Sequence, residues 1–399
     1  MRLAHYAALA IAVATAAGAQ ENTAQHDRPA ACAAPAHWYT LGSDGPQPAG
    51  ARALLTEAAK RQVVLLGEQH DSAEDHAWQL QTLAALHFLR PDLAIGFEAF
   101  PRRLQPVLDR WSAGELNARQ FLEQAEWDKV WRFPPSLYLP LFEFARLNRI
   151  PMVALNVEHK LVESIGARGW DAVPDAEKEG VTRPAAPAKA YEDTLYEVFL
   201  AHGKEGQDRK AKGRDDPAFR RFVESQTTWD RAMAEALAAR TRAAAGTAAP
   251  LVVGILGTGH VRNGHGVAHQ LRDLGVREVA SLLPVDGVHG CAELRAGFAD
   301  AVFVAARAPR DPAPRPRLGV QLGDREGAIE IVAVTAGSLA EQTGLRAGDR
   351  IVTLAGAPVK SMARMIAAVR AQPAGTWLPI TVRRGEETVD IVIRFPPST

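Results

Sequence analysis

The chain has 399 residues, of which 47% are hydrophobic and 23% are charged. This composition is typical of globular proteins and excludes a disordered or fibrous chain, and the length leaves room for two domains. Lys plus Arg and Asp plus Glu each total 46, so there is no net positive field to attract nucleic acid or an anionic membrane surface.

The first 19 residues have the pattern of a cleaved signal peptide. Arg2 supplies a positive start, residues 3–16 are apolar, and residues 17–19 are Ala, Gly and Ala, which fit the cleavage pattern. The apolar run is shorter than the ~20 residues that span a bilayer, so we expect no transmembrane segment. No Cys directly follows the run, so a lipid-modified N-terminus is not expected. The pattern predicts a periplasmic or secreted protein.

Residues 20–50 are rich in Ala, Pro, Gln and Gly, and we interpret them as an N-terminal tail. Short apolar runs then alternate with helical patterns, which predicts an α/β domain over residues 51–306 with a mainly parallel sheet covered by helices. Within it, residues 174–218 are charged and rich in Ala, Pro and Gly, and indicate an insertion. The predicted strands are residues 62–66, 93–97, 150–155, 251–256 and 278–283.

The chain has two cysteines, Cys32 and Cys291. An oxidising compartment outside the cytosol permits a disulfide between them, and we expect such a bridge to join the N-terminal tail to the end of the large domain. Two isolated cysteines do not make a zinc site of the CxxC kind.

Polar residues follow four of the predicted strands. In an open parallel sheet, ligands bind beyond the carboxyl ends of the strands, so these side chains are expected to converge at one edge. A single His at a strand end is more often solvated than ligating, but repeated His and Glu at equivalent positions favour a ligand or metal site. The residues are Glu68 and His70 after the first strand, Glu98 after the second, Asn156 after the third, and His260 and His265 after the fourth.

Residues 307–316 are dominated by Pro and Arg, which cannot continue a helix or an inner strand, and are predicted to be a linker. Residues 317–395 then show short β-type runs, Gly turns and two helical stretches, which predict a small second domain rich in β-structure.

Several motifs follow one another in the large domain: Gly67-Glu68-Gln69-His70-Asp71 with His76, Gly96-Phe97-Glu98, Trp127-Asp128, Tyr138, Ala154-Leu155-Asn156, Trp229-Asp230 and Gly257-Thr258-Gly259-His260 with His265. In this order they resemble the ChaN-like haem-binding uptake family, in the superfamily of Tiki, TraB and erythromycin-esterase-like proteins. The resemblance covers roughly residues 50–290. It implies haem binding and iron uptake, or the metal-dependent proteolysis of Tiki members, with Glu68, His70, Glu98 and His260 as candidate metal-site residues.

Two functions are consistent with that resemblance. A haem binder offers an iron ligand, an apolar cleft and basic groups for the propionates; the candidates are His70, His76, Tyr138, Asn156, His260 and His265, with Trp127, Trp131, Phe133, Arg102 and Arg132 as neighbours. Alternatively, a divalent transition metal would make the domain a peptidase or esterase in which Glu68, His70, Glu98 and His260 are catalytic. We expect a binding protein rather than an enzyme.

The second domain carries Leu318-Gly319-Val320 and the turn Gly344-Leu-Arg-Ala-Gly-Asp349, and it resembles bacterial PDZ domains. The resemblance implies that a peptide or protein C-terminus adds a strand beside Val320. Its carboxylate would lie at the Leu318–Val320 turn, opposite a helix that presents Met362 and Ile366. The leading hypothesis is therefore an exported haem- or metal-binding protein with a peptide-recruiting module; the oligomeric state is left open.

Overall fold

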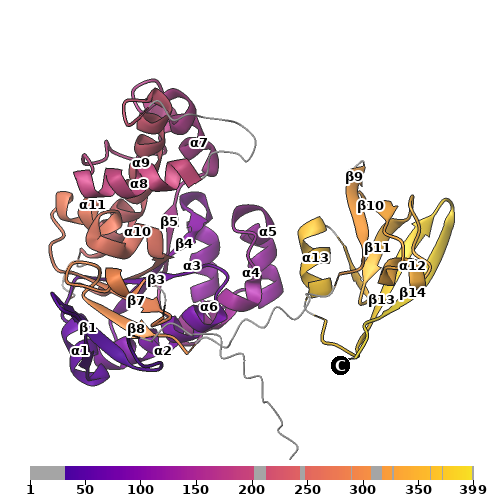
Figure 1. The fold of residues 1–399 in the computed structure, drawn as a ribbon, viewed down its shortest axis with the longest axis horizontal. Helices are drawn as coiled ribbons and strands as arrows, with labels where there is room; N and C mark the ends of the chain where they lie inside the picture. Colours follow the sequence, from indigo (N-terminus) through magenta and orange to yellow (C-terminus); the bar gives the residue numbers. More distant parts are fainter. Residues whose placement is uncertain are drawn as a thin grey trace, which may run out of the picture.

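A computed structural model describes residues 32–201, 213–242, 248–288, 290–306, 317–325, 328–359, 361–370 and 372–397. The predicted signal peptide at 1–19 and the Pro/Arg-rich linker at 307–316 lie outside these residues. The described chain builds two separate sheets, one before and one after the linker (Figure 1). No helix among the described residues is both long and apolar enough to cross a membrane.

The first sheet has eight strands in the order β2-β1-β8-β7-β3-β6-β4-β5. Its central pairs, among them β3 with β6 and β6 with β4, are parallel, which confirms the predicted fold class. β3, β4 and β6 are buried along their whole length, which explains why they are continuous apolar runs. The strands are β1 (Trp38–Gly42), β2 (Gly45–Ala49), β3 (Val63–Glu68), β4 (Leu93–Pro101), β5 (Met152–Asn156), β6 (Leu251–Gly257), β7 (Val279–Val285) and β8 (Ala301–Val304).

The antiparallel hairpin β1–β2 lies at one edge of this sheet, where β1 pairs with β8. It falls within the segment that the sequence analysis assigned to a tail. Its outer strand contains Pro46 and Pro48, which lack an N–H group, and such residues are confined to edge strands. Because of these prolines the sequence pattern did not predict β2, which is compatible only with an edge position.

Helices cover both faces of the sheet, and each face has its own buried cluster. One cluster joins the sheet to α2, α3 and α6 and contains Trp111, Tyr138 and Phe142; the other joins it to α9 and α11 and contains Met233 and Leu271. The helices are α1 (Ala51–Ala58), α2 (Ala73–Leu89), α3 (Gln105–Ser112), α4 (Ala118–Gln124), α5 (Trp127–Val130), α6 (Pro135–Leu147), α7 (His159–Arg168), α8 (Lys189–Ala201), α9 (Pro217–Arg240), α10 (Thr258–Val261) and α11 (Val267–Asp273).

The second sheet is antiparallel in the order β14-β13-β11-β10-β9, with β12 paired to β11. Its elements are β9 (Val320–Arg325), β10 (Ala328–Val334), α12 (Leu339–Gln342), β11 (Arg350–Leu354), β12 (Ala357–Pro358), α13 (Met362–Arg370), β13 (Trp377–Arg384) and β14 (Glu387–Arg394). Buried Asp349 accepts two hydrogen bonds from Arg384, both at 2.8 Å, and so joins the turn before β11 to the end of β13. This is the small β-rich domain that the sequence predicted.

Cys32 and Cys291, the pair that the sequence analysis named, are joined by a disulfide across a sequence separation of 259 residues. The Cys32 N–H also donates to the Gly287 carbonyl at 3.0 Å. The bridge therefore holds the start of the described chain beside the segment that follows β7.

Replacing both cysteines with Ser is expected to lower the free energy of unfolding of the large domain by roughly 2–5 kcal/mol, because a long covalent loop restricts the unfolded chain. Guanidinium denaturation followed by Trp fluorescence measures the change. Wild type with reductant should reproduce the double variant. Coincident curves for oxidised wild type and the double variant would contradict a stabilising role.

Candidate functional site

The ends of four neighbouring strands bring the predicted polar residues together. Glu68 ends β3, Glu98 lies in β4, Asn156 ends β5, and α10 with His260 follows β6 directly. Glu68, Glu98 and Asn156 are all buried. Because β3, β6, β4 and β5 are adjacent and parallel, their carboxyl ends meet at one edge.

One chain of hydrogen bonds, the first arm, runs from Tyr138 through Glu68 to His70. The Tyr138 hydroxyl donates to Glu68 Oε1 at 2.5 Å, and His70 Nδ1 lies 2.8 Å from the same oxygen. His76 Nδ1 lies 3.4 Å from the other oxygen. Burial opposes ionisation of Glu68, but the His70 hydrogen bond and the charge of His76 hold its pKa below the ordinary value. The carboxylate is thus charged; its Oε1 is hydrogen-bonded, whereas its buried Oε2 has no hydrogen-bond partner among the described residues.

A second arm of the same composition runs from Tyr191 through Asp230 to His260. The Tyr191 hydroxyl donates to Asp230 Oδ2 at 2.8 Å, and His260 Nδ1 lies 2.7 Å from Asp230 Oδ1. Burial alone would lower the pKa of His260, but the charges of Glu98 and Asp230 outweigh it and raise that pKa to about 9. His260 is therefore an imidazolium at neutral pH.

Glu98 lies between the two arms. Its Oε1 is 3.6 Å from His260 Nε2, and its Oε2 accepts from the Gly257 N–H at 2.7 Å. A Cβ on Gly257 would lie 2.9 Å from His70 Cε1 and 3.1 Å from His70 Nε2. Glycine is required here because only a residue without a side chain lets His70 approach the end of β6 so closely.

Aromatic rings flank both imidazoles. The His70 ring centroid lies 4.7 Å from that of Trp131 and 5.2 Å from that of Phe133. The His260 ring lies 5.3 Å from that of Trp229. The His70 side chain is 28% exposed and that of His260 is 13% exposed, so His70 is the more accessible end of the cluster.

The predicted metal set of Glu68, His70, Glu98 and His260 is not supported. Within the described ranges, no three or more His, Cys, Asp or Glu side chains form a group that could hold a metal ion. The physical reason is that the carboxylates already accept hydrogen bonds from Tyr138 and from the Gly257 N–H and lie against the imidazoles. The four residues are close together, but as mutually paired charges.

Three other predicted residues are not placed to ligate haem or a metal directly. His76 is buried, with Nδ1 3.1 Å from Gln79 Oε1 and Nε2 3.3 Å from the His70 carbonyl. Asn156 donates to the Glu98 carbonyl at 2.9 Å and supports that strand. His265 is not part of either hydrogen-bonded arm, although its ring centroid lies 5.9 Å from that of Tyr191. Burial and the charge of His269 lower the pKa of His265.

Two residues of the second arm, Asp230 and Tyr191, were not among the predicted site residues. Asp230 precedes Met233 by three residues and Leu237 by seven, so an acid stands on the apolar stripe of α9. A carboxylate in such a stripe needs a buried partner, and this was the signal for its role. Tyr191 had no comparable signal because it belongs to the predicted insertion.

Comparison with known proteins confirms the resemblance to both families. The family model described as "Haem-binding uptake, Tiki superfamily, ChaN" matches residues 54–271, and a PDZ domain model matches residues 316–394. No curated protein matches the chain.

Among solved structures, cofacial haem-bound ChaN of Campylobacter jejuni is similar at 18% identity with a TM-score of 0.52, over 67% of this chain and 96% of that one. At this identity the likeness shows the fold. A serine endoprotease from Yersinia pestis matches at 24% identity with a TM-score of 0.19, over 21% of this chain and 30% of its own.

The high pKa of His260 can be tested by NMR titration. The midpoint is expected near 9 in wild type, and lower in Asp230→Asn because one of the two stabilising negative charges is lost. Since the folded-state pKa exceeds the ordinary 6.5, the associated stability is complete below pH 6.5 and is lost as the pH rises through about 9.

Asp109→Asn is the control, because exposed Asp109 on α3 accepts a hydrogen bond from Gln105 and belongs to neither arm. A wild-type midpoint near 6.5, or the same midpoint in Asp230→Asn, would contradict the proposed charge pairing.

Proposed function

Because the chain belongs to the ChaN family of haem-binding uptake proteins in the Tiki superfamily, and carries a PDZ domain, we propose that it is an exported haem-handling protein. The PDZ domain would recruit it to peptide or protein C-termini. The observation that carries the haem proposal is the first arm: a partly exposed His70, held by a buried carboxylate and bordered by aromatic rings.

The residues around His70 fit a haem. Glu68 accepts a hydrogen bond from the His70 Nδ1–H group, which fixes the imidazole ring and raises its basicity. The Nε2 atom of His70 is then the nitrogen that can ligate iron. Trp131 and Phe133 supply apolar surface for a macrocycle. Bound haem would supply an iron centre that accepts a nitrogen ligand, which His70 would provide.

Two earlier candidates take supporting roles in this proposal. Tyr138 is 1% exposed, and its hydroxyl is committed to Glu68, so it orients the first arm rather than reaching iron. Arg102 donates to Glu235 and to the carbonyls of Glu179 and Ala232. Exposed Arg132, beside Trp131 and Phe133 in sequence, is the better candidate for a propionate.

Titration of the mature protein with haemin should give a saturable Soret shift near one equivalent. His70→Ala is expected to abolish saturation because the nitrogen ligand is lost, and Glu68→Gln to weaken binding by roughly 10–100-fold because the ligand loses its oriented partner. Exposed His37 provides the control variant His37→Ala, which should bind as wild type.

A weak, non-saturating response in wild type would contradict haem handling. Saturable binding that is equal in His70→Ala would instead place haem elsewhere on the chain.

The peptide-binding proposal rests on the open edge of the second sheet. β9 pairs only with β10 among the described strands, so its other edge can accept an added strand. Gly319, just before β9, has a φ of +79°, and a Cβ there would lie 2.2 Å from Ser338 Cβ. Leu318 is buried, and Val320 is half-buried.

The helix α13 supports part of the predicted groove. Ile366 is 38% exposed and Met362 is half-buried, so both can contact a peptide. Met365 and Val369 belong to the core of the domain. We therefore assign the apolar wall of the groove to Met362 and Ile366.

Peptides with an apolar C-terminal residue should bind the full chain in fluorescence polarisation. C-terminal amidation should remove binding because the carboxylate is the recognised group, and Ile366→Asp should weaken it by placing a charge on the apolar wall. Equal binding of the free and amidated peptides would contradict C-terminal recognition.

Export is supported by the Cys32–Cys291 disulfide, since such bridges persist in oxidising compartments and are rare in the cytosol. The same conclusion follows from the predicted signal peptide, so the proposal rests on two separate features of the chain.

A further inference from the structure

The segment between α7 and α9 contributes a residue to the site. We define the strap as residues 179–188, which lead directly into α8. Tyr191, in the first turn of α8, is 4% exposed, and its hydroxyl donates to Asp230 at 2.8 Å. The second arm therefore begins in the predicted insertion, whereas the first begins at Tyr138 on α6.

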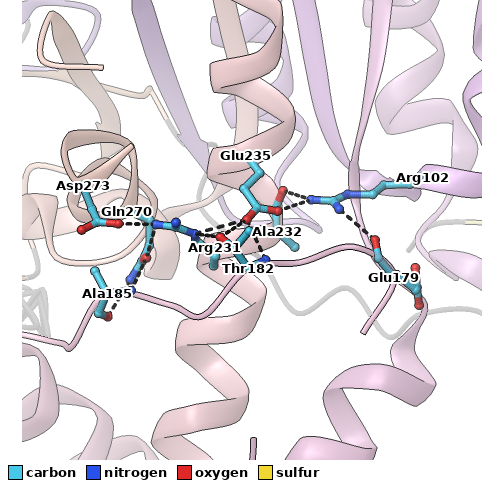
Figure 2. Close-up of polar contacts among 9 residues, drawn as sticks. All are labelled: Arg102, Glu179, Thr182, Ala185, Arg231, Ala232, Glu235, Gln270 and Asp273. Carbon is cyan, nitrogen blue, oxygen red and sulfur yellow. Dashed lines mark hydrogen bonds and ion pairs between the residues drawn. The ribbon is translucent and has the colours of Figure 1, made fainter. Parts of the chain in front are cut away.

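The strap is held against α9 by a charged network (Figure 2). The carboxylate of Glu235 accepts from the Thr182 N–H at 2.8 Å and from the Thr182 hydroxyl at 2.5 Å. Figure 2 shows Glu235 between Arg231, one turn earlier on α9, and Arg102, which directly follows β4; the two guanidinium groups lie 3.3 Å and 3.1 Å from the Glu235 oxygens. One carboxylate thus joins the strap to two guanidinium groups.

A second anchor lies closer to α8. The side-chain amide of Gln270 on α11 accepts from the Ala185 N–H at 2.9 Å and donates to the Ala185 carbonyl at 3.0 Å (Figure 2). His269 Nε2 lies 2.9 Å from the Ala186 carbonyl. These contacts fix the chain just before α8, and so they place the Tyr191 hydroxyl.

We propose that Tyr191 is a positioning residue for His260, and that the strap sets the geometry of the second arm through this hydroxyl. Asp230 is fully buried and has one oxygen on His260 and the other on Tyr191. Without the hydroxyl, that second oxygen is buried without this donor, and the carboxylate is free to rotate away from the imidazole. Loosening the strap would act on His260 and leave His70 in place.

This proposal deepens the proposed function by naming a control element for the same site, but its test needs no haem. Three Tyr→Phe variants of the full chain are compared by ¹⁵N-histidine NMR, which reports the Nδ1–H···carboxylate hydrogen bond of each imidazole. Tyr191→Phe should shift the His260 signals alone, and Tyr138→Phe the His70 signals alone. Tyr196→Phe is the matched control on α8, because the Tyr196 ring packs on Phe219 and does not reach Asp230.

An unchanged His260 signal in Tyr191→Phe would overturn the proposal, as would equal shifts of both imidazoles, which indicate general loosening. Circular dichroism confirms that each variant is folded. Because these spectra are recorded without haem, failure of wild type to bind haemin would overturn the proposed function alone.

The strap itself is tested with Glu235→Gln, which removes the charge that holds Arg102, Arg231 and Thr182 together. Hydrogen exchange of the α8 amides should accelerate, and the His260 signals should move in the same direction as in Tyr191→Phe. Faster exchange with His260 signals at their wild-type positions would overturn the role of the strap.

Discussion

Three buried carboxylates, Glu68 on β3, Glu98 on β4 and Asp230 on α9, constrain the rest of the large domain. Glu68 and Glu98 are each 3% exposed and Asp230 is 0% exposed, and a buried charge is tolerated only when it is paired and hydrogen-bonded. The two imidazoles, the two tyrosine hydroxyls and the Gly257 N–H provide those partners. This requirement explains several local features, because each one brings a donor to a carboxylate. They are the Gly257 N–H, the turns after β3 and β6 that carry the two histidines, and the packing of α8 that places Tyr191.

The central strands were predictable because parallel strands that are buried on both faces consist of continuous apolar residues in the sequence. The convergence of Glu68, Glu98 and His260 followed from the same rule, since residues at the carboxyl ends of adjacent strands must meet. The β1–β2 hairpin was not predicted, because its two prolines resemble a loop and its stability depends on pairing with β8, which lies more than 250 residues later in the chain. Local sequence does not contain that pairing.

The nature of the site was harder to predict than its location. The sequence predicts that two imidazoles and two carboxylates lie at one edge of the sheet. It does not show whether these groups point toward a shared ligand or pair with one another. Tyr138 and Tyr191 decide this, because each donates to a carboxylate and fixes it against a histidine Nδ1. Tyr191 comes from a segment whose composition suggested only an insertion. The second arm could therefore be found only once the contacts between α8 and α9 were known.

The two arms have the same pattern of hydrogen bonds, but their histidines differ in exposure to solvent. This difference suggests different roles for the two arms. The His70 side chain is about twice as exposed as that of His260, and its aromatic neighbours Trp131 and Phe133 are themselves half-buried. A flat apolar ligand would therefore meet the first arm from solvent. His260 is paired with Asp230 and Glu98 and lies deeper, so in the proposed function it would act on a ligand through Glu98 and through its positive charge. The first arm starts on α6 and does not depend on the strap, whereas the second arm does. A change in the strap would therefore alter the geometry of His260 without altering ligand binding at His70.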